Sequence, residues 1–235
     1  MLLPIGNRFL YHLMNSLELQ LTADGSHTLY IPDMDEHYHS VNGAIQESQH
    51  VYIEAAFNQY QKNEIHVLEL GFGTGLNAFL TALEAKKRGI NVFYTTLEKY
   101  PLSSQVIEKL NYGASSVDEI NLFQQIHACE WESPCSITSS FVLRKVETDF
   151  LEYDFFNKCY DVVYYDAFAP DKQSEVWNQD IFNRLFSSMN PDGILTTYCA
   201  KGAIRRMMQQ AGFKVERIPG PPGKREMLRA RKIIS

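Results

Sequence analysis

The sequence predicts an α/β protein built on a doubly wound, mostly parallel sheet that ends in an antiparallel hairpin. Strand-like and helix-like segments alternate from residue 65 onward, without repeats, low-complexity tracts or a long Ser/Gly linker. The strand-like segments are almost continuously apolar, as expected when helices cover both faces of a sheet. With 235 residues and 45% hydrophobic content, we expect one domain over 1–235, with 1–60 as an N-terminal extension or lid and 61–235 as the core.

Each element has its own local signal. Strands are expected at 65–70, 91–99, 141–149, 160–168 and 194–200, and helices at 77–88, 174–189 and 202–212. Gly89 ends the first helix, and Pro101 suits the first turn of another. "NPDG" (190–193) predicts a turn.

The last two strands, "FKVERI" (213–218) and "REMLRARKI" (225–233), are joined by "PGPPGK" (219–224). This link is too short for a helical crossover, so the pair is expected to form an antiparallel hairpin. A doubly wound sheet with that ending is the Rossmann-like topology associated with class I methyltransferases.

The composition narrows the cellular context and the partners. Four cysteines without CxxC spacing predict free thiols in a reducing cytosol. The N-terminal 17 residues do not resemble a signal peptide, and no apolar run is long enough for a membrane span, so a cytoplasmic protein without a membrane partner is expected. The net charge is −6, yet residues 201–235 carry ten Lys or Arg against two Glu. That basic end indicates either a polyanion-binding surface or the solvated sides of a helix and hairpin.

The stretch "VLELGFGTGLNAFL" (67–80) breaks an apolar strand with three glycines. It lacks the Gly-Lys-Ser/Thr of a P-loop, and Leu76 occupies the third small position of a dinucleotide fingerprint, which disfavours NAD or FAD. The pattern is acidic-x-Gly-x-Gly-x-Gly, and it permits close approach of a ligand to the backbone. A carboxylate suits a ligand such as S-adenosylmethionine (SAM), which has a sulfonium and an α-amino group. The candidate cofactor-binding residues here are Glu69, Gly71, Gly73, Gly75 and Asn77.

Two further acids close predicted strands. Glu98 follows the glycines at the distance typical of an acid that binds ribose hydroxyls. Asp149 ends the third predicted strand, where an acid typically receives the adenine amino group in this architecture. Either acid alone fits a solvent-facing strand end equally well, whereas both together with the glycines favour a SAM site.

The segment "DVVYYDAFAPDKQSEVW" (161–177) places Asp166 at the carboxyl end of a parallel strand, where α/β sheets bind ligands. We interpret Asp166 as a catalytic residue that also contacts the cofactor: it orients an acceptor amine or takes its proton, while Phe168 packs against the acceptor. Burial beside a sulfonium lowers the pKa of such an amine and so favours its nucleophilic form. The alternative is that Asp166 only caps the following turn.

The N-terminal "EHYHS" contains His37 and His39 on a possible strand. Two histidines without a third ligand are weak evidence for a metal site, and no metal is expected. Contact with substrate by a lid is the favoured interpretation of both residues.

Four stretches together resemble the methyltransferase half of the MnmC family: "ELGFGTGLN", "DAFAPDKQSEVW", "EHYHSVNGAIQESQHVYIEAAF" (36–57) and "GFKVERIPGPPGKREML". The resemblance covers most of 25–230. It implies methylation of 5-aminomethyl(-2-thio)uridine at the tRNA wobble position, with SAM as cofactor and the anticodon arm of tRNA as partner. The candidate substrate-contacting residues, drawn from this resemblance, the lid segment and the basic end together, are His37, His39, Pro170, Lys172, Trp177, Lys224 and Arg225.

The sequence departs from that family in two ways. Gln173 and Ser174 stand where Asn-Pro is expected, which removes turn rigidity near the acceptor. The family's FAD-dependent oxidase domain is not expected in 1–235, so a separate enzyme is expected to supply the aminomethyl substrate. Two other functions stay open: a small-molecule amine N-methyltransferase, and a nucleotide-binding oxidoreductase or non-catalytic module of the same fold.

Overall fold

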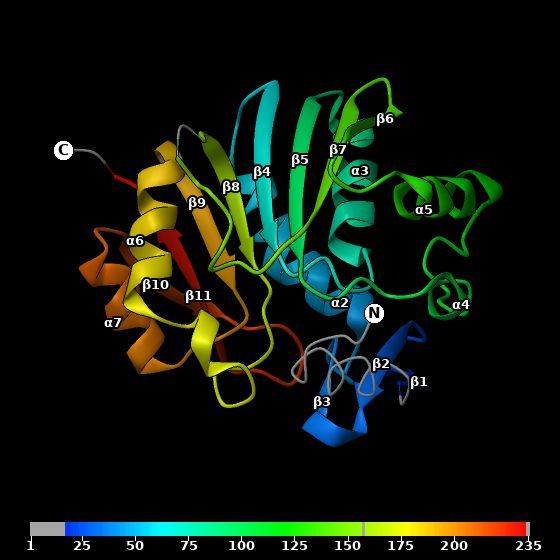
Figure 1. The fold of residues 1–235 in the computed structure, drawn as a ribbon, viewed down its shortest axis with the longest axis horizontal. Coiled ribbons are helices and arrows are strands. Elements are labelled where there is room, and N and C mark those ends of the chain that lie inside the picture. The colour runs from blue at the N-terminus through cyan, green and yellow to red at the C-terminus, as the bar shows by residue number, and fades with distance from the viewer. Residues whose placement is uncertain (1–16, 157, 234–235) are drawn as a thin grey trace, which may run out of the picture.

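The computed structural model describes residues 17–156 and 158–233. Within these residues, eight strands form one sheet in the order β10-β11-β9-β8-β4-β5-β7-β6 (Figure 1). The strands are β4 (Glu64–Leu70), β5 (Asn91–Glu98), β6 (Pro134–Thr138), β7 (Phe141–Glu147), β8 (Tyr160–Tyr165), β9 (Met189–Thr197), β10 (Lys214–Pro219) and β11 (Glu226–Arg231). The five central strands are parallel, and β10–β11 form the expected antiparallel hairpin, so the predicted fold class is confirmed.

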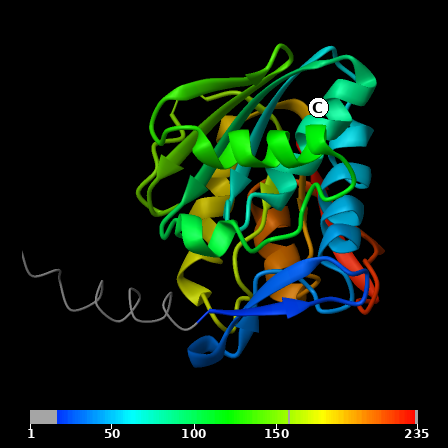
Figure 2. The same cartoon turned by 90° about the vertical axis from the view of Figure 1, so that its right-hand side faces the viewer.

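Helices cover both faces of this sheet (Figures 1 and 2). Helices α3 (Leu76–Arg88) and α5 (Val117–Ala128) pack into one buried cluster together with alternate strand residues such as Val67 and Tyr164. Helices α6 (Gln179–Ser188) and α7 (Gly202–Gln210) pack into a second cluster with the intervening residues, such as Leu68 and Tyr165. The near-continuous apolar strands therefore bury both of their faces, as the sequence pattern requires. No helix in the described residues has the length and apolar character needed to cross a membrane.

Short elements precede the large sheet. Strands β1 (Glu18–Leu21), β2 (His27–Ile31) and β3 (Glu36–His37) form a small antiparallel sheet, with the 3-10 helix η1 (Pro32–Met34) between β2 and β3. Helix α2 (Ala44–Ser48) continues into the π-helix η2 (Gln49–Glu54), followed by the 3-10 helix η3 (Phe57–Gln59). In Figure 1 the small sheet lies beyond the lower edge of the large one. The lid function of 1–60 stays a prediction, and the interpretation of the first 17 residues falls almost entirely outside the described part.

Several predicted boundaries were wrong. The strand expected at 160–168 ends at Tyr165, and the helix expected at 174–189 is a 3-10 turn, η4 (Ser174–Val176), followed by α6 from Gln179. Asn178 causes the late start, because its side chain accepts a hydrogen bond from the backbone N–H of Ile181 and so caps α6. Pro101 precedes the short helix α4 (Ser104–Ile107) instead of opening it.

The turn predicted at "NPDG" lies inside a strand. β9 already begins at Met189, which pairs with Tyr160, whereas Ile194 pairs with Val162. Residues 190–193 therefore bulge out of the ladder, with Asp192 at a φ of 62°. The turn chemistry is present, but it bends one strand and does not separate two elements.

The cysteine prediction was half wrong. Cys129, just after α5, and Cys135, in β6, form a disulfide with a Cα–Cα distance of 6.0 Å, which is within normal disulfide geometry. β6 pairs antiparallel with β7 and brings the two cysteines together, although the sequence of 128–140 shows no recognisable motif. Cys159 is an exposed free thiol and Cys199 a buried one.

The order of the strands fixes where a ligand can approach. The chain moves from β4 to β5 and β7 on one side, then returns to β8 on the other side of β4. The carboxyl ends of β4 and β8 thus flank the point where the winding reverses. Open α/β sheets bind their ligands at this point.

Candidate active site

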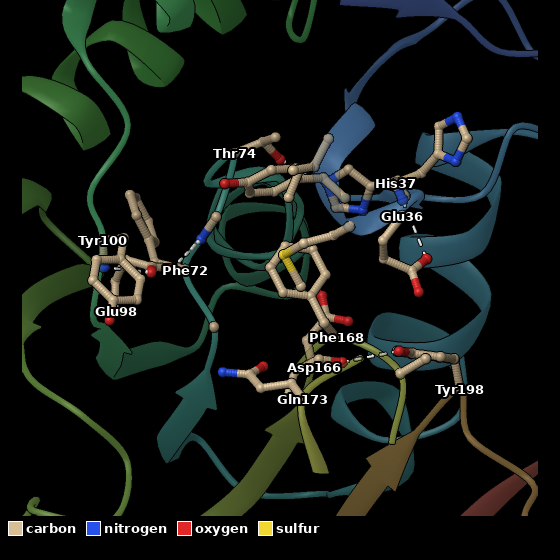
Figure 3. Close-up of a pocket in the computed structure, with 18 of the residues that line it drawn as sticks. Glu36, His37, Phe72, Thr74, Glu98, Tyr100, Asp166, Phe168, Gln173 and Tyr198 are labelled. Carbon is tan, nitrogen blue, oxygen red and sulfur yellow. Dashed lines mark hydrogen bonds between the residues drawn. The ribbon is translucent and has the colours of Figure 1, made fainter. Parts of the chain in front are cut away.

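A cavity of about 440 Å³ opens at the carboxyl ends of β4, β5 and β8. The loop after β4 and the segment after β8 form its floor, and residues of the small sheet form the opposite wall. Figure 3 shows its two ends. The glycine end contains Gly71, Gly73, Glu98 and Asp149, and the aspartate end contains Glu47, Asp166, Tyr198 and Lys224.

The glycine end is shaped by backbone geometry. Gly71 has a φ of 98°, and a Cβ there would collide with the carbonyl oxygen of Asp166. Its N–H donates to the carbonyl of Leu97 at 3.0 Å, which ties the loop to β5. A side chain at Gly71 would therefore be strained and would also separate the loops that follow β4 and β8.

Glu98 is fixed by main-chain donors. Its Oε2 accepts the N–H of Gly73 and its Oε1 accepts the N–H of Tyr100, both at 2.9 Å (Figure 3). Burial raises the pKa of Glu98 above its ordinary value, and these hydrogen bonds oppose the rise. The carboxylate faces the cavity in a fixed orientation and has lone pairs left for further donors.

Asp149 also lines the cavity. Lys99 donates to its Oδ2 at 2.6 Å, and the N–H of Leu151 donates to its Oδ1 at 3.0 Å. Burial favours the neutral acid, but these hydrogen bonds and the Lys99 charge outweigh it and hold the pKa of Asp149 below its usual value. This acid therefore stays ionised as part of an ion pair.

Asp166 dominates the other end. The hydroxyl of Tyr52 donates to its Oδ1 at 2.5 Å, and the amide of Asn77 donates to its Oδ2 at 2.8 Å. Burial raises the pKa of Asp166 to about 7, although both hydrogen bonds act to lower it. Near neutral pH the ionised and protonated forms are both populated, which is the condition under which a carboxylate exchanges protons with a ligand.

Aromatic rings stand around Asp166. Phe168 packs edge-to-face against Tyr38 of the small sheet segment, with ring centroids 5.2 Å apart. Tyr198 donates its hydroxyl to the carbonyl of Ala167 at 2.9 Å (Figure 3). Trp177 is buried and donates its indole N–H to the carbonyl of Phe168 at 2.8 Å, so it fixes the Phe168 backbone from behind.

Lys224 reaches the cavity from the turn between β10 and β11. Its ammonium lies 2.6 Å from the buried carboxylate of Glu47 and 3.9 Å from the ring centroid of Tyr198. Glu47 in turn accepts the N–H of Ser40 at 2.8 Å. The ion pair therefore joins the C-terminal hairpin to α2 and to the segment that carries the two histidines.

His37 and His39 both line the cavity, but they differ in environment. His37 ends β3, bonds Gln20 at 3.0 Å and packs on Tyr30. His39 lies beyond β3 and bonds the Thr74 hydroxyl at 2.6 Å, and burial lowers its pKa to about 4. A neutral His39 thus links the small sheet to the glycine loop.

The remaining predicted residues lie outside the cavity lining. Glu69 is fully buried beneath it, Gly75 precedes α3, and Asn77 reaches the cavity only through Asp166. On the surface, Lys172 lies 3.9 Å from Asp35, with Pro170 just before it in the loop, and Arg225 is exposed. None of these placements tests a role in binding, so the roles stay predictions.

Comparisons with known proteins agree with this architecture. Residues 121–233 match the family model described as "S-adenosyl-L-methionine-dependent methyltransferase". The chain is 29% identical over 229 residues to the tRNA 5-methylaminomethyl-2-thiouridine biosynthesis bifunctional protein MnmC of Cupriavidus metallidurans, covering 90% of the chain and 33% of the relative. The MnmC of Actinobacillus pleuropneumoniae is 26% identical, covering 92% and 36%.

A solved structure of MnmC2 from Aquifex aeolicus superposes with a TM-score of 0.77 at 24% identity, over 99% of this chain and 79% of that one. The resemblance to the MnmC family is confirmed. The chain is thus similar to MnmC proteins over most of its length, and residues 121–233 match a SAM-dependent methyltransferase family. It spans about a third of the length of the MnmC relatives that it matches.

Sequence reasoning missed several residues of this candidate site. Tyr52 and Glu47 lie in the same N-terminal stretch that carries part of the MnmC resemblance, yet neither has a recognisable motif. Tyr52 lies in η2, and π-helical turns are frequent at functional sites, but their position is not readable from sequence. Tyr38 and Tyr198 were missed for the same reason, because each becomes part of the site only through folding.

Proposed function

We propose that this protein is a SAM-dependent N-methyltransferase that converts 5-aminomethyl(-2-thio)uridine at the tRNA wobble position to the 5-methylaminomethyl form. The observation that carries the proposal is the placement of Asp166, which lies in one cavity with the glycine loop and has a pKa near neutrality. The names of the MnmC relatives support the choice of substrate. A separate enzyme would supply the aminomethyl group.

The glycine end fits SAM. Glu98 presents a carboxylate held by two main-chain N–H groups, which suits the paired hydroxyls of a ribose. Asp149 lies beyond it as an ionised acid that suits an exocyclic amino group. The cavity volume of about 440 Å³ is within the usual range for small-molecule sites. When bound, SAM supplies an electrophilic methyl group whose bond to sulfur breaks as the acceptor nitrogen bonds to carbon.

The aspartate end fits an acceptor amine. Tyr52 and Asn77 hold both oxygens of Asp166, so the carboxylate cannot rotate away from the cavity. Asp166 accepts a hydrogen bond from the amine, orients its lone pair and takes up the proton that the amine loses. The edge-to-face pair of Tyr38 and Phe168 offers apolar surface against which an unstacked pyrimidine packs.

The charges around the cavity mouth favour tRNA over a small neutral substrate. Arg206 on α7 and Arg225 in the hairpin turn are exposed, and neither makes an ion pair within the described residues. Both are free to contact phosphates of the anticodon arm without reading its sequence. Arg229 and Lys232 do not contribute, because they bond Glu216 and the carbonyl of Met189.

The test is methylation of authentic substrate. Wild-type protein is incubated with SAM and with tRNA from cells that lack this methyl group, and the nucleosides are identified by mass spectrometry. We expect one methyl group to be added to the aminomethyl nitrogen. Asp166→Asn should bind SAM about as well as wild type but lose about 10²- to 10⁴-fold in kcat.

Two outcomes would contradict the proposal. Wild-type turnover by Asp166→Asn would leave Asp166 as a turn cap only. SAM binding without any tRNA product, combined with methylation of small alkylamines, would assign the protein to the small-molecule N-methyltransferases.

A further inference from the structure

Glu69 is an acid that does not line the cavity. It lies near the end of β4, fully buried, beneath the cavity floor. Its Oε2 accepts a hydrogen bond from the Thr96 hydroxyl at 2.7 Å. Its Oε1 is buried and has no hydrogen-bond partner. A carboxylate left in this state is costly, because a buried acceptor without a donor loses its solvation and gains nothing in return.

The side-chain amide of Asn77 is also incompletely hydrogen-bonded. Its Nδ2 donates to Asp166, but its Oδ1 is buried without a partner. Asn77 and Tyr94 both lie close enough to Glu69 to lower its pKa by hydrogen bonding, and the buried Tyr94 hydroxyl has no partner of its own. Three neighbouring side chains below Asp166 therefore carry two buried acceptor oxygens and one hydroxyl without partners.

Counting donors decides the protonation state. The Tyr94 hydroxyl has one hydrogen and can satisfy only one of the two oxygens. A hydrogen on Glu69 Oε1 satisfies both oxygens. That hydrogen is donated to Asn77 Oδ1, and Glu69 Oε1 accepts the hydrogen of the Tyr94 hydroxyl. Rotating the Asn77 amide instead would direct its oxygen at the Asp166 carboxylate. One proton thus accounts for every polar atom of the cluster.

The electrostatic surroundings agree. The groups that face Glu69 are Tyr94 and Thr96 from β5, Asn77 from α3, Tyr164 from β8, and Asp166. None is a cation. Burial, with a further contribution from the Asp166 charge, raises the pKa of Glu69 to about 8, although the hydrogen bonds from Thr96, Asn77 and Tyr94 act to lower it. Two carboxyl groups linked by one amide titrate as a pair, and the deeper one retains its proton.

We propose that Glu69 is a positioning residue that carries a proton at neutral pH and donates it to Asn77 Oδ1. The amide then presents its N–H to Asp166, which keeps Asp166 ionised and aimed at the cavity. This inference depends on the proposed function, since it treats Asp166 as the group that receives the acceptor amine. It replaces the view that Glu69 is a carboxylate for the cofactor's positive charge.

Two substitutions separate these roles. Glu69→Gln keeps a donor for Asn77 Oδ1 and an acceptor for the Thr96 hydroxyl, so SAM affinity and kcat should stay within about fivefold of wild type. Glu69→Leu removes the donor, and kcat should fall about 10- to 100-fold while SAM affinity changes little. The pH profile of Glu69→Gln should lose any inflection near pH 8, because no proton leaves this site.

The proton itself is observable without any methyl acceptor. Infrared difference spectra of protein containing isotope-labelled glutamate should show a protonated carboxylic acid at neutral pH that disappears in Glu69→Gln. Stability gives a second readout. Because the folded pKa lies above the ordinary 4.5, the contribution of Glu69 to stability is complete below about pH 4.5 and is lost as pH rises through about 8. The melting temperature of Glu69→Gln relative to wild type should therefore rise across that window.

The outcomes are distinct. If Glu69→Gln loses tenfold or more in SAM affinity, the carboxylate serves the cofactor and the inference is wrong. It is also wrong if the infrared band of a protonated acid is absent or survives the substitution. If the band and the stability trend appear but tRNA is not methylated, the protonated Glu69 stands and the proposed substrate fails.

Discussion

The two ends of the cavity are held in different ways. At the glycine end, main-chain N–H groups fix Glu98, and the N–H of Leu151 together with the Lys99 ammonium fixes Asp149. At the aspartate end, side chains do this work: Tyr52 and Asn77 hold Asp166, and Lys224 holds Glu47. The first arrangement depends on backbone geometry and tolerates changes of neighbouring side chains. The second can be altered one hydrogen bond at a time, and it contains Asp166, the proposed catalytic residue.

Burial acts on the pKa values at both ends. Glu98 and Asp166 are both displaced upward by burial, and both receive hydrogen bonds that oppose the displacement. Asp166 has the charge of Glu47 nearby and receives its hydrogen bonds from two side chains, and its pKa reaches about 7. A binding acid benefits from a fixed charge, whereas an acid that exchanges protons needs a pKa near the working pH. The two ends are therefore suited to different tasks.

The largest expected effect comes from Gly71→Ala, because this glycine joins the two ends. The added Cβ meets the Asp166 carbonyl oxygen at a φ of 98°, so the loop and the segment after β8 must move apart. SAM affinity should fall about 10- to 100-fold or more, and turnover should fall with it. Calorimetry with SAM measures the first effect, and thermal unfolding reports whether the fold persists.

Gly89→Ala is the matched control. Gly89 also has a positive φ, 66°, but its Cβ would meet nothing within 4 Å, at the far end of α3. This variant incurs backbone strain without the collision, so its SAM affinity should resemble that of wild type. Equal SAM affinities for wild type, Gly71→Ala and Gly89→Ala would show that close contact between the loop after β4 and the segment after β8 is unimportant for SAM binding.

Much of the glycine end could be predicted from the sequence. The run from β4 through the glycines to α3 is a local pattern, and Glu98 follows it along one further helix and strand. The regular right-handed winding of β-α-β units brings such positions together in any protein of this type. The structure accordingly places Gly71, Gly73, Glu98 and Asp149 around one cavity.

The aspartate end could not be predicted to the same extent. Tyr52 is 114 positions from Asp166, and Glu47 is 177 positions from Lys224. No short-range periodicity encodes such pairings, since they depend on how the N-terminal segment packs against the finished sheet. The fold pairs Lys224 with a buried glutamate, a contact that the basic residues around it in sequence do not indicate, and its contact with tRNA stays a prediction.

A smaller effect is expected from Tyr52→Phe, which changes the aspartate end alone. The Tyr52 hydrogen bond lowers the pKa of Asp166 against the rise caused by burial, so its loss should raise that pKa further. The carboxylate must be ionised to accept a proton, so the rise of kcat with pH should move to higher pH. At pH 7 kcat should fall about tenfold, with little change in SAM affinity.

Tyr60→Phe provides the control at the other end of β8. The Tyr60 hydroxyl donates to Asp161 at 2.6 Å, at the amino end of β8, far from the cavity. Both substitutions remove one tyrosine hydrogen bond from an aspartate, but only Tyr52→Phe should displace the pH profile. An identical displacement in both variants would show that general destabilisation, not the Asp166 contact, changes the activity.

The smallest effect, and the last test, concerns the exposed charges beside the aspartate end. β11 runs antiparallel to β9, so Arg231 lies at the edge of the sheet opposite the cavity, while the hairpin turn with Arg225 lies at the cavity edge. Arg206→Glu with Arg225→Glu should therefore weaken tRNA binding and reduce the slope of log affinity against log salt by about one unit per lost phosphate contact. SAM affinity should be unchanged, because neither residue lines the cavity.

The control is the same two charge reversals at Lys86 and Lys87, which lie in the last turn of α3 at the opposite edge of the sheet. A general change in net charge would affect both pairs of variants equally, so the control should keep the wild-type slope. Equal slopes for all three proteins would remove this surface from the tRNA interface and leave the cavity alone to select its substrate.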